Sequence, residues 1–417
     1  MSLTHSPLTL GRHPVRLAPA YRLVNAETVT EAHLFVGLDP EPGAALLVPD
    51  NNQARASAKL VDRATAELLT GAMPSEPDSC PTLAALVLDG VLVLDLPDGP
   101  VTGPRALQQM GDLAEPVPSV DVRLARHRSR QAGPRRYPPG PPEFLARGAG
   151  STVSPSRLGA LSLAALGRAH RLASTAPDPM RLAHWLYACN SMPATPGWAQ
   201  TADHLDRQIG EALRRGWLVE HAGSTTQAWV QWHHPDADLK APTCKLYTSV
   251  HPADRLSAFR PWVEGVARAG ARAFKAGRGA QGLLRPDGLV AYFDDPEVML
   301  DAVEVLRRAL DGCRSQGVPF TADVPGRDDA LFSWGIDPPR TARLAGWDRL
   351  TSWRSWITAR LARLLTDADA AQCTESQTTD FVNARLRLDG VDPTTWTPPA
   401  HCWRDDPPST TTKARRG

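Results

Sequence analysis

The chain has 417 residues, 42% of them hydrophobic and 22% charged, and this length predicts two domains and not a single core. Its 46 basic and 45 acidic residues give a formal net charge of +1, so no large field attracts nucleic acid or anionic lipid. The sequence shows no apolar stretch of membrane-spanning length and no secretory signal, which predicts a cytoplasmic protein without a membrane partner.

Residues 1–115 are predicted to form a small α+β unit. Short strands are expected at 20–27 and 44–49, and a helix at 61–73. Asp62 is the expected N-cap of that helix. A second helix turns at Asp89 and Gly90 into a strand, and Pro97-Asp98-Gly99 makes a hairpin. Helices followed by a hairpin are typical of a winged-helix domain.

Residues 18–107 resemble the PqqD-like domains that recognise precursor peptides. The resemblance is carried by the segments "DRATAELLTGA" and "TLAALVLDGVLVLD". The resemblance implies that a leader peptide adds a strand to a sheet edge and places side chains in a helix groove. Winged helices also bind DNA. The expected helices carry Asp62, Arg63, Glu67 and Asp89 and no stripe of arginine or lysine, which argues against a nucleic-acid partner.

Residues 116–150 are rich in Pro, Gly and Arg, and their apolar residues follow neither helical nor strand spacing, which predicts a linker. Its arginines either face solvent or meet an acidic peptide. A larger α+β domain is expected at 151–400, with a mostly antiparallel sheet flanked by helices. Residues 401–417 are expected to form a disordered tail.

Periodicity sets the expected elements of the larger domain. Helices are expected at 155–173, 178–193, 201–221, 252–259, 261–270, 295–313, 352–371 and 378–390, and strands at 227–235, 244–252, 272–277, 289–295, 317–324 and 330–339. Pro261 is expected to begin one helix, and Asp295 with Pro296 to begin another. The twelve tryptophans are interpreted as core and helix-face anchors.

The stretch "ARAFKAGRGAQGLLRPDGLVAYF" contains a G-x-G-x-x-G at Gly277, Gly279 and Gly282. A dinucleotide site needs such glycines to follow a strand and open a helix. Here a break at Pro286 and a second strand are expected in place of the helix, so no nucleotide cofactor is predicted. The segment is either a plain hairpin loop or a loop whose N–H groups and arginines meet a phosphate.

Lysine is rare in this chain, with only Lys59, Lys240, Lys245, Lys275 and Lys413 among 46 cationic residues. Arginine cannot lose its proton in a protein, whereas a partly buried lysine can act as a base. Each lysine is therefore either a candidate base or a residue that was retained by chance in a sequence whose coding bias favours arginine. The six scattered cysteines form no C-x-x-C pair, which predicts reduced thiols and no metal site.

Alternation in "CKLYTSVH" places Lys245, Tyr247, Ser249 and His251 on one face of a strand. That face is either solvent-exposed or one wall of a cleft. If 272–277 pairs beside this strand, Lys275 shares the face, and each lysine lowers the pKa of the other. Such a lysine can remove a weakly acidic proton.

Two arginines on the glycine-rich stretch, Arg278 and Arg285, are candidate bidentate ligands for phosphate. Together with the lysines they suit the elimination of phosphate from phosphoserine or phosphothreonine. That reaction needs a base for the Cα proton, cations for the leaving phosphate and an acid. It requires no metal or cofactor, and no metal or nucleotide motif is present.

The order "WLYACNSMP", "WVQWHH", "KLYTSV", "AFKAG" and "RPDGLVAYF" resembles the HopA effector-like family over residues 155–340. Members of this family are phospho-Ser/Thr lyases in class V lanthipeptide and thioamitide pathways. The positions that match the family best are Lys275 and the turn from Arg285 to Asp287, and the resemblance itself does not assign the catalytic roles. The roles of Lys245, Tyr247 and His251 depend on the face geometry alone. Three further residues, Asp323, Ser333 and Asp337, belong either to the same cleft or to a buried strand pair.

The sequence therefore predicts a lyase that acts on a ribosomally made precursor peptide. Lys275 is the expected base, Lys245 its helper or substitute, Arg278 and Arg285 the phosphate ligands, and His251 or Tyr247 the acid. An alternative is a non-catalytic adaptor that binds the leader and presents it to a partner kinase or cyclase. A third hypothesis is a DNA-binding regulator with a ligand-sensing second domain.

Overall fold

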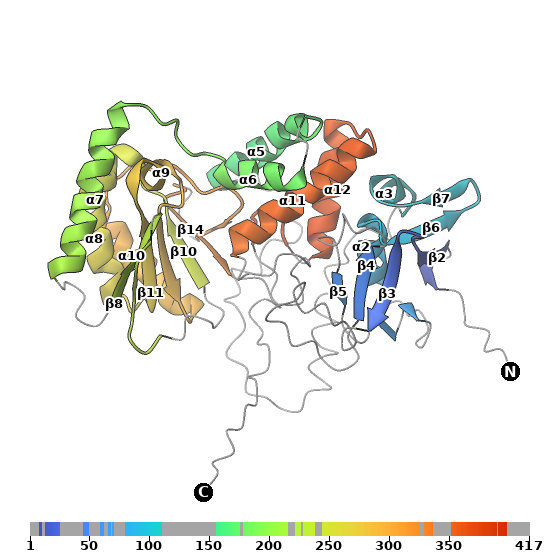
Figure 1. Ribbon diagram of the computed structural model, residues 1–417, viewed down its shortest axis with the longest axis horizontal. Helices are drawn as coiled ribbons and strands as arrows, with labels where there is room; N and C mark the ends of the chain where they lie inside the picture. Colours follow the sequence, from blue (N-terminus) through green and yellow to red (C-terminus); the bar gives the residue numbers. More distant parts are fainter. Residues whose placement is uncertain are drawn as a thin grey trace, which may run out of the picture.

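The computed structural model describes residues 8–10, 13–25, 45–49, 59–61, 66–67, 69–70, 80–110, 156–175, 178–215, 222–226, 228–237, 244–324, 329–336, 352–389 and 391–397. The predicted linker and tail lie outside these ranges. In Figure 1 a seven-stranded sheet stands at one end and the N-terminal unit at the other, with α5 (Arg157–Ala173), α6 (Pro179–Ala188), α11 (Trp353–Ala370) and α12 (Glu375–Leu388) between them. These helices and antiparallel sheets confirm the α+β class.

The described part of the N-terminal unit contains two antiparallel sheets, with the strand orders β1-β2-β6-β7 and β3-β4-β5. The strands are β1 (Thr9–Leu10), β2 (His13–Leu17), β3 (Tyr21–Asn25), β4 (Ala45–Pro49), β5 (Lys59–Val61), β6 (Leu92–Leu96) and β7 (Gly99–Val101), and the helices are α2 (Cys80–Leu88) and α3 (Pro104–Met110). The predicted strands at 20–27 and 44–49 are confirmed as β3 and β4.

The predicted turns of this unit are present. Gly99 has a φ of +123° and lies in the hairpin between β6 and β7, and Gly90 has a φ of +72° at the end of α2. Asp89 is only 5% exposed, so its charge is not on a surface that could repel DNA. The winged-helix assignment stays a prediction, because Asp62 and most of the helix expected at 61–73 lie outside the described residues, while Val61 ends β5.

The large sheet has the strand order β13-β14-β10-β12-β11-β9-β8 and is antiparallel throughout its described strands. Its strands are β13 (Ala322–Asp323), β14 (Phe332–Ile336), β10 (Cys244–Thr248), β12 (Leu289–Phe293), β11 (Ala273–Gly277), β9 (Trp229–His233) and β8 (Ala222–Thr225). Leu246 pairs with Ala291 and Trp334, and Phe274 pairs with Ala291 and Trp232. These residues form one apolar face, which is the core of the domain.

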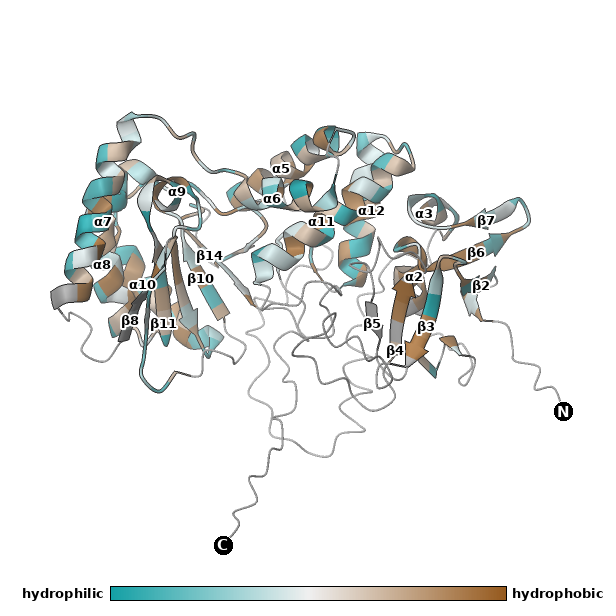
Figure 2. Cartoon of the chain, in the orientation of Figure 1, coloured by the Kyte–Doolittle hydropathy of each residue, from teal (hydrophilic) through white to brown (hydrophobic). Residues whose placement is uncertain are grey.

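The helices α7 (Gly197–Arg215), α8 (Arg255–Arg268) and α10 (Pro296–Ala309) cover this core face. Trp232 stacks on Phe274 with a centroid distance of 5.3 Å, and Trp262 of α8 donates a hydrogen bond to the Thr248 hydroxyl at 3.0 Å. In Figure 2 hydrophilic and hydrophobic residues alternate along α7, as expected for an amphipathic helix with one buried side.

One predicted helix start is right and another is wrong. Asp295 caps α10, because its carboxylate accepts a hydrogen bond from the Glu297 amide at 2.6 Å, and Pro296 follows it. Pro261, by contrast, lies inside α8 and does not begin a helix. Proline removes one backbone hydrogen bond there. Trp262 and Val263 are fully buried beside it, and this burial offsets the loss.

The expected absence of a helix after the glycine motif is also wrong. A short helix, α9 (Gly279–Leu284), follows β11 and precedes β12. A dinucleotide fold nevertheless does not form, since β12 runs antiparallel to β11 and the motif requires a parallel strand. The amides of Gly277, Gly279 and Gly282 already donate to Gly288, Asp206 and Arg278, so these N–H groups are not directed at a phosphate.

Gly277 and Gly282 lie against each other where α9 folds back on β11. A Cβ added to Gly282 would lie 2.1 Å from the carbonyl carbon of Gly277, which is backbone and cannot rotate away. We expect Gly282→Ala to lower the free energy of unfolding by about 1–3 kcal/mol, measured by urea denaturation. Gly167→Ala in α5 is the control, because its Cβ would meet only the far ends of the flexible Glu375 and Arg171 side chains. Equal stability of the two variants would contradict the close contact.

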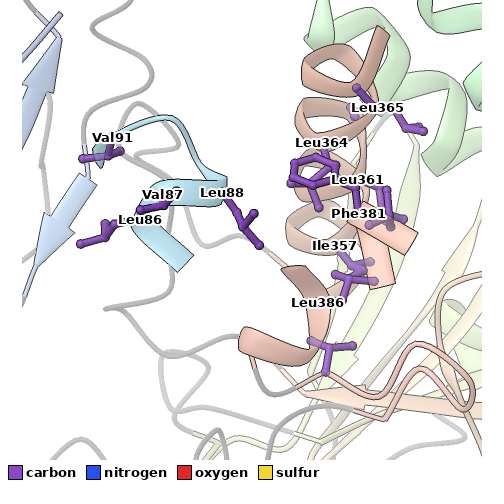
Figure 3. Close-up of a cluster of buried hydrophobic side chains, with 14 of the residues drawn as sticks. Leu86, Val87, Leu88, Val91, Ile357, Leu361, Leu364, Leu365, Phe381 and Leu386 are labelled. Carbon is purple, nitrogen blue, oxygen red and sulfur yellow. The ribbon is translucent and has the colours of Figure 1, made fainter. Parts of the chain in front are cut away.

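The four central helices share one hydrophobic cluster with the N-terminal unit. Figure 3 shows α2 on one side of this cluster and α11 with α12 on the other; the labelled residues are Leu86, Val87, Leu88, Val91, Ile357, Leu361, Leu364, Leu365, Phe381 and Leu386. The first part of the chain and the C-terminal helices are thus packed into a common core. No helix in the described ranges is both long enough and apolar enough to span a bilayer.

Candidate active site

The face of the large sheet opposite its core carries both predicted lysines. Lys245 pairs with Tyr292 of β12, and Lys275 pairs with Val290 of the same strand. Paired residues in a sheet point to the same side, and these lie opposite the core. We define the polar face as Trp229, Gln231, Lys245, Tyr247, Lys275, Tyr292 and Ser333. The expected pairing of 272–277 beside 244–252 does not occur, because β12 lies between the two strands.

The ring of Tyr292 is shared by the two lysines. The Nζ of Lys245 lies 5.4 Å from its centroid and the Nζ of Lys275 lies 5.9 Å from it. Lys245 is buried, with 8% exposure, and Lys275 is half-buried. An aromatic face attracts a cation without removing its charge. The polar face therefore presents positive charge on a partly apolar surface.

Trp229 joins Arg285 to this group. The Nζ of Lys275 lies 4.2 Å from the centroid of the Trp229 ring, and the Cζ of Arg285 lies 4.5 Å from the same centroid. Arg285 directly follows α9, whose fold-back against β11 brings this residue to the sheet. Lys275 and Arg285 therefore belong to one site, although they are ten positions apart in the chain.

Asp287 holds Arg285 in place. The Nε of Arg285 donates to Asp287 Oδ1 at 2.5 Å, and an Nη of Arg285 donates to Oδ2 at 3.0 Å, which makes a bidentate pair. Asp287 also accepts a hydrogen bond from the Tyr187 hydroxyl at 3.3 Å and pairs with Arg354 at 2.5 Å. Tyr187 comes from α6 and Arg354 from α11, so three separate segments of the chain meet at this carboxylate.

The surrounding charges keep Asp287 ionised although it is buried. Burial alone would raise its pKa, but Arg354 and Arg285 lower the pKa well below the usual range, and Lys275 adds to their effect. For Tyr187, burial and then the charge of Asp287 raise the pKa. At neutral pH Asp287 is therefore an anion and Tyr187 a neutral hydrogen-bond donor.

The two residues predicted as acids have different surroundings. Tyr247 is 3% exposed, shares the polar face with Lys245 and packs against Val290 and Val318. His251 lies beyond the end of β10, where its Nδ1 accepts a hydrogen bond from the Ala253 amide and caps the 3₁₀ helix η7 (Pro252–Asp254). Its ring contacts Trp198 at a centroid distance of 6.4 Å.

The remaining predicted residues are spread around the sheet. Arg278 is the N-cap of α9, and its amide donates to the carbonyl of Ala228 at 3.0 Å. Ser333 pairs with Tyr247 across β10 and β14, is 1% exposed, and its hydroxyl has no hydrogen-bond partner among the described residues. Asp323 accepts a hydrogen bond from Ser156, and Asp337 lies outside the described residues.

Sequence reasoning missed four residues of this site, namely Trp229, Tyr292, Tyr187 and Arg354. Alternation in "LVAYF" does place Tyr292 opposite the core residues Leu289, Ala291 and Phe293, so that signal was available. Trp229 was taken for a core anchor because its partner strand was unknown. Tyr187 and Arg354 lie on helices far away in the sequence, and no local pattern connects them with Asp287.

Among the described residues, no group of three or more His, Cys, Asp or Glu side chains is placed to hold a metal ion. No protein-family model matches the chain, and no curated protein matches it.

Several solved structures are similar to this chain. The effector from Pseudomonas syringae pv. tomato strain DC3000 has 12% identity and a TM-score of 0.34, over 58% of this chain and 98% of its own. The effector from P. syringae pv. syringae strain 61 has 12% identity and a TM-score of 0.32, over 58% and 99%. The phosphothreonine lyase effector VirA (SpvC) of Chromobacterium violaceum has 12% identity and a TM-score of 0.25, over 38% and 99%.

Proposed function

We propose that the chain is a lyase that removes phosphate from phosphoserine or phosphothreonine in a ribosomally made precursor peptide. The products are dehydroalanine or dehydrobutyrine and inorganic phosphate. The observation that carries the proposal is the grouping of Lys245, Lys275 and Arg285 around the rings of Tyr292 and Trp229. A phosphate leaving group needs cationic donors such as Lys245 and Arg285 in a partly desolvated site, and Lys275 beside them is the proposed base.

The proposed reaction is a β-elimination. Lys275 acts as the base after it has given up its own proton to solvent, while Lys245 and Arg285 stay cationic. Its amine takes the Cα proton, and the electrons of the Cα–H bond form the Cα=Cβ double bond. The Cβ–O bond breaks, and its electron pair leaves with the phosphate. Lys245 is the proposed helper or substitute base, because it lies on the same face as Lys275 and shares the Tyr292 ring with it.

Arg278 and Arg285 are the proposed phosphate ligands. Arg285 has the stronger support, because Asp287 fixes its guanidinium and Trp229 brings it beside Lys275. For the acid, Tyr247 is supported by its place on the polar face. His251 accepts a hydrogen bond at Nδ1, which leaves Nε2 to carry a proton.

The N-terminal unit is proposed to bind the leader of the precursor peptide. Among the described strands, β3 and β5 are the outer strands of its three-stranded sheet, and an outer strand can pair with an extended peptide through backbone hydrogen bonds. Binding the leader at this unit would keep the phosphorylated part of the same peptide close to the polar face at a high effective concentration.

The test is to incubate the protein with peptides that carry a leader and one phosphoserine or phosphothreonine. Mass spectrometry should show that each peptide loses the mass of one phosphoric acid. A thiol that is then added to the mixture should attach to the new double bond. Unphosphorylated peptides are the control and should not change. Tight leader binding without phosphate loss from any peptide would overturn the lyase and leave the adaptor.

A further inference from the structure

The end of α11 reaches the polar face from outside the sheet. Trp353, the first residue of α11, packs on Gly335 of β14 so closely that a Cβ added to Gly335 would lie 2.6 Å from the Trp353 Cδ1. Gly335 pairs directly with Lys245. The indole of Trp353 also donates to the Phe320 carbonyl at 2.9 Å. The N-terminus of α11 is therefore fixed at the edge of the candidate site.

Arg354 is the second residue of α11 and is 1% exposed. It pairs with Asp287 at 2.5 Å, donates to the Tyr187 carbonyl at 2.7 Å, and lies 4.4 Å from the centroid of the Tyr187 ring. Arg285, by contrast, is half-buried and contacts Trp229 on the polar face. Asp287 thus has an inner arginine and an outer arginine on the same carboxylate.

We infer that Arg354 is a positioning residue, which holds the Asp287 carboxylate so that this carboxylate fixes the outer Arg285 for phosphate binding. The inference rests on the proposed function. Arg354 itself touches no substrate in this arrangement. With Arg354 removed, Asp287 would be a buried anion with one cationic partner fewer, and it would turn toward Arg285 or toward solvent. Either change misplaces the Arg285 guanidinium. A displacement of about 1 Å at such a site can lower the reaction rate by about 100-fold.

The experiment measures binding of a peptide whose phosphoserine is replaced by its phosphonate isostere, in which carbon replaces the bridging oxygen and elimination is blocked. We expect Arg354→Gln and Arg285→Gln each to weaken binding by roughly 10- to 100-fold. Arg354→Gln with Arg285→Gln should bind no more weakly than Arg285→Gln alone, because the two act through one guanidinium. Arg354→Lys keeps the charge near Asp287 and should restore part of the affinity.

The control is Arg363→Gln on the same helix, since Arg363 contacts Tyr21 and Asp367 and leaves Asp287 untouched. Its phosphonate affinity should equal that of the unmodified protein. Additive losses in the double variant, or unchanged affinity in folded Arg354→Gln, would overturn the inference. So would failure of both Arg354 variants to fold, which would make the residue structural. If the unmodified protein binds the phosphonate peptide no more tightly than the unphosphorylated parent peptide, the proposed function itself is wrong, whatever the Arg354 variants show.

Discussion

Lys275→Ala is expected to lower kcat for phosphate elimination by a factor of about 10² to 10⁴, the usual contribution of a general base. The variant loses the amine that would take the Cα proton, while the proposed phosphate ligands Arg278 and Arg285 remain. The rate of phosphate release from a leader-bearing phosphopeptide measures the effect. Binding of the phosphonate isostere should weaken much less than the rate falls.

Lys275→Arg separates the two tasks that a lysine can perform here. Arginine keeps the positive charge beside Trp229 but cannot act as a base, so this variant should bind phosphonate and remain as inactive as Lys275→Ala. Arg363→Gln on α11 is the control, because Arg363 contacts Tyr21 and Asp367 and no residue of the polar face, and it should keep full activity. Full activity in Lys275→Ala would end the base assignment even if the protein proves to be a lyase, and full activity in Lys275→Arg would reduce the lysine to an electrostatic role.

Local patterns predicted much of the secondary structure because each of them depends on neighbouring residues only. Alternation in "CKLYTSV" separated Leu246 from Lys245 and Tyr247 correctly, since a strand turns each successive side chain to the opposite face. The cap at Asp295 was equally local. At Pro261 the apolar spacing of Phe259, Trp262, Val263 and Val266 continues through the proline, so the sequence already contained the signal for one helix.

Strand order is not local, and this limited the prediction of the site. The two lysines were expected on adjacent strands, whereas β12 and its Tyr292 lie between them. The rarity of lysine drew attention to Lys275, and the Arg-Pro-Asp turn drew attention to Arg285. Nothing of this kind marks Arg354, which is one of many arginines in an arginine-rich chain. Its position against Asp287 follows from the packing of α11, which no short pattern encodes.

The middle of α11 is held by a buried ion cluster that joins this helix to the N-terminal unit. Asp89, at the end of α2, accepts from Arg385 of α12 at 2.7 and 3.0 Å and from Arg360 of α11 at 3.1 Å. Asp389 contacts the same two arginines at 2.8 Å each. Burial, and then the nearby Arg385, lower the pKa of Arg360 to about 10, whereas the charge of Asp389 raises it.

Asp89→Ala is therefore expected to lower the free energy of unfolding by about 3–5 kcal/mol, because it leaves two buried guanidinium groups with Asp389 alone. Urea denaturation followed by circular dichroism measures the loss. Asp95→Ala is the control, since its pair with Arg16 is exposed and should contribute only about 0–1 kcal/mol. Asp89→Ala should lose less in an Arg385→Met background, where one fewer cation is left uncompensated. A loss below about 1 kcal/mol in the single variant would mean that the apolar cluster of Figure 3, and not the ion cluster, holds the N-terminal unit on α11.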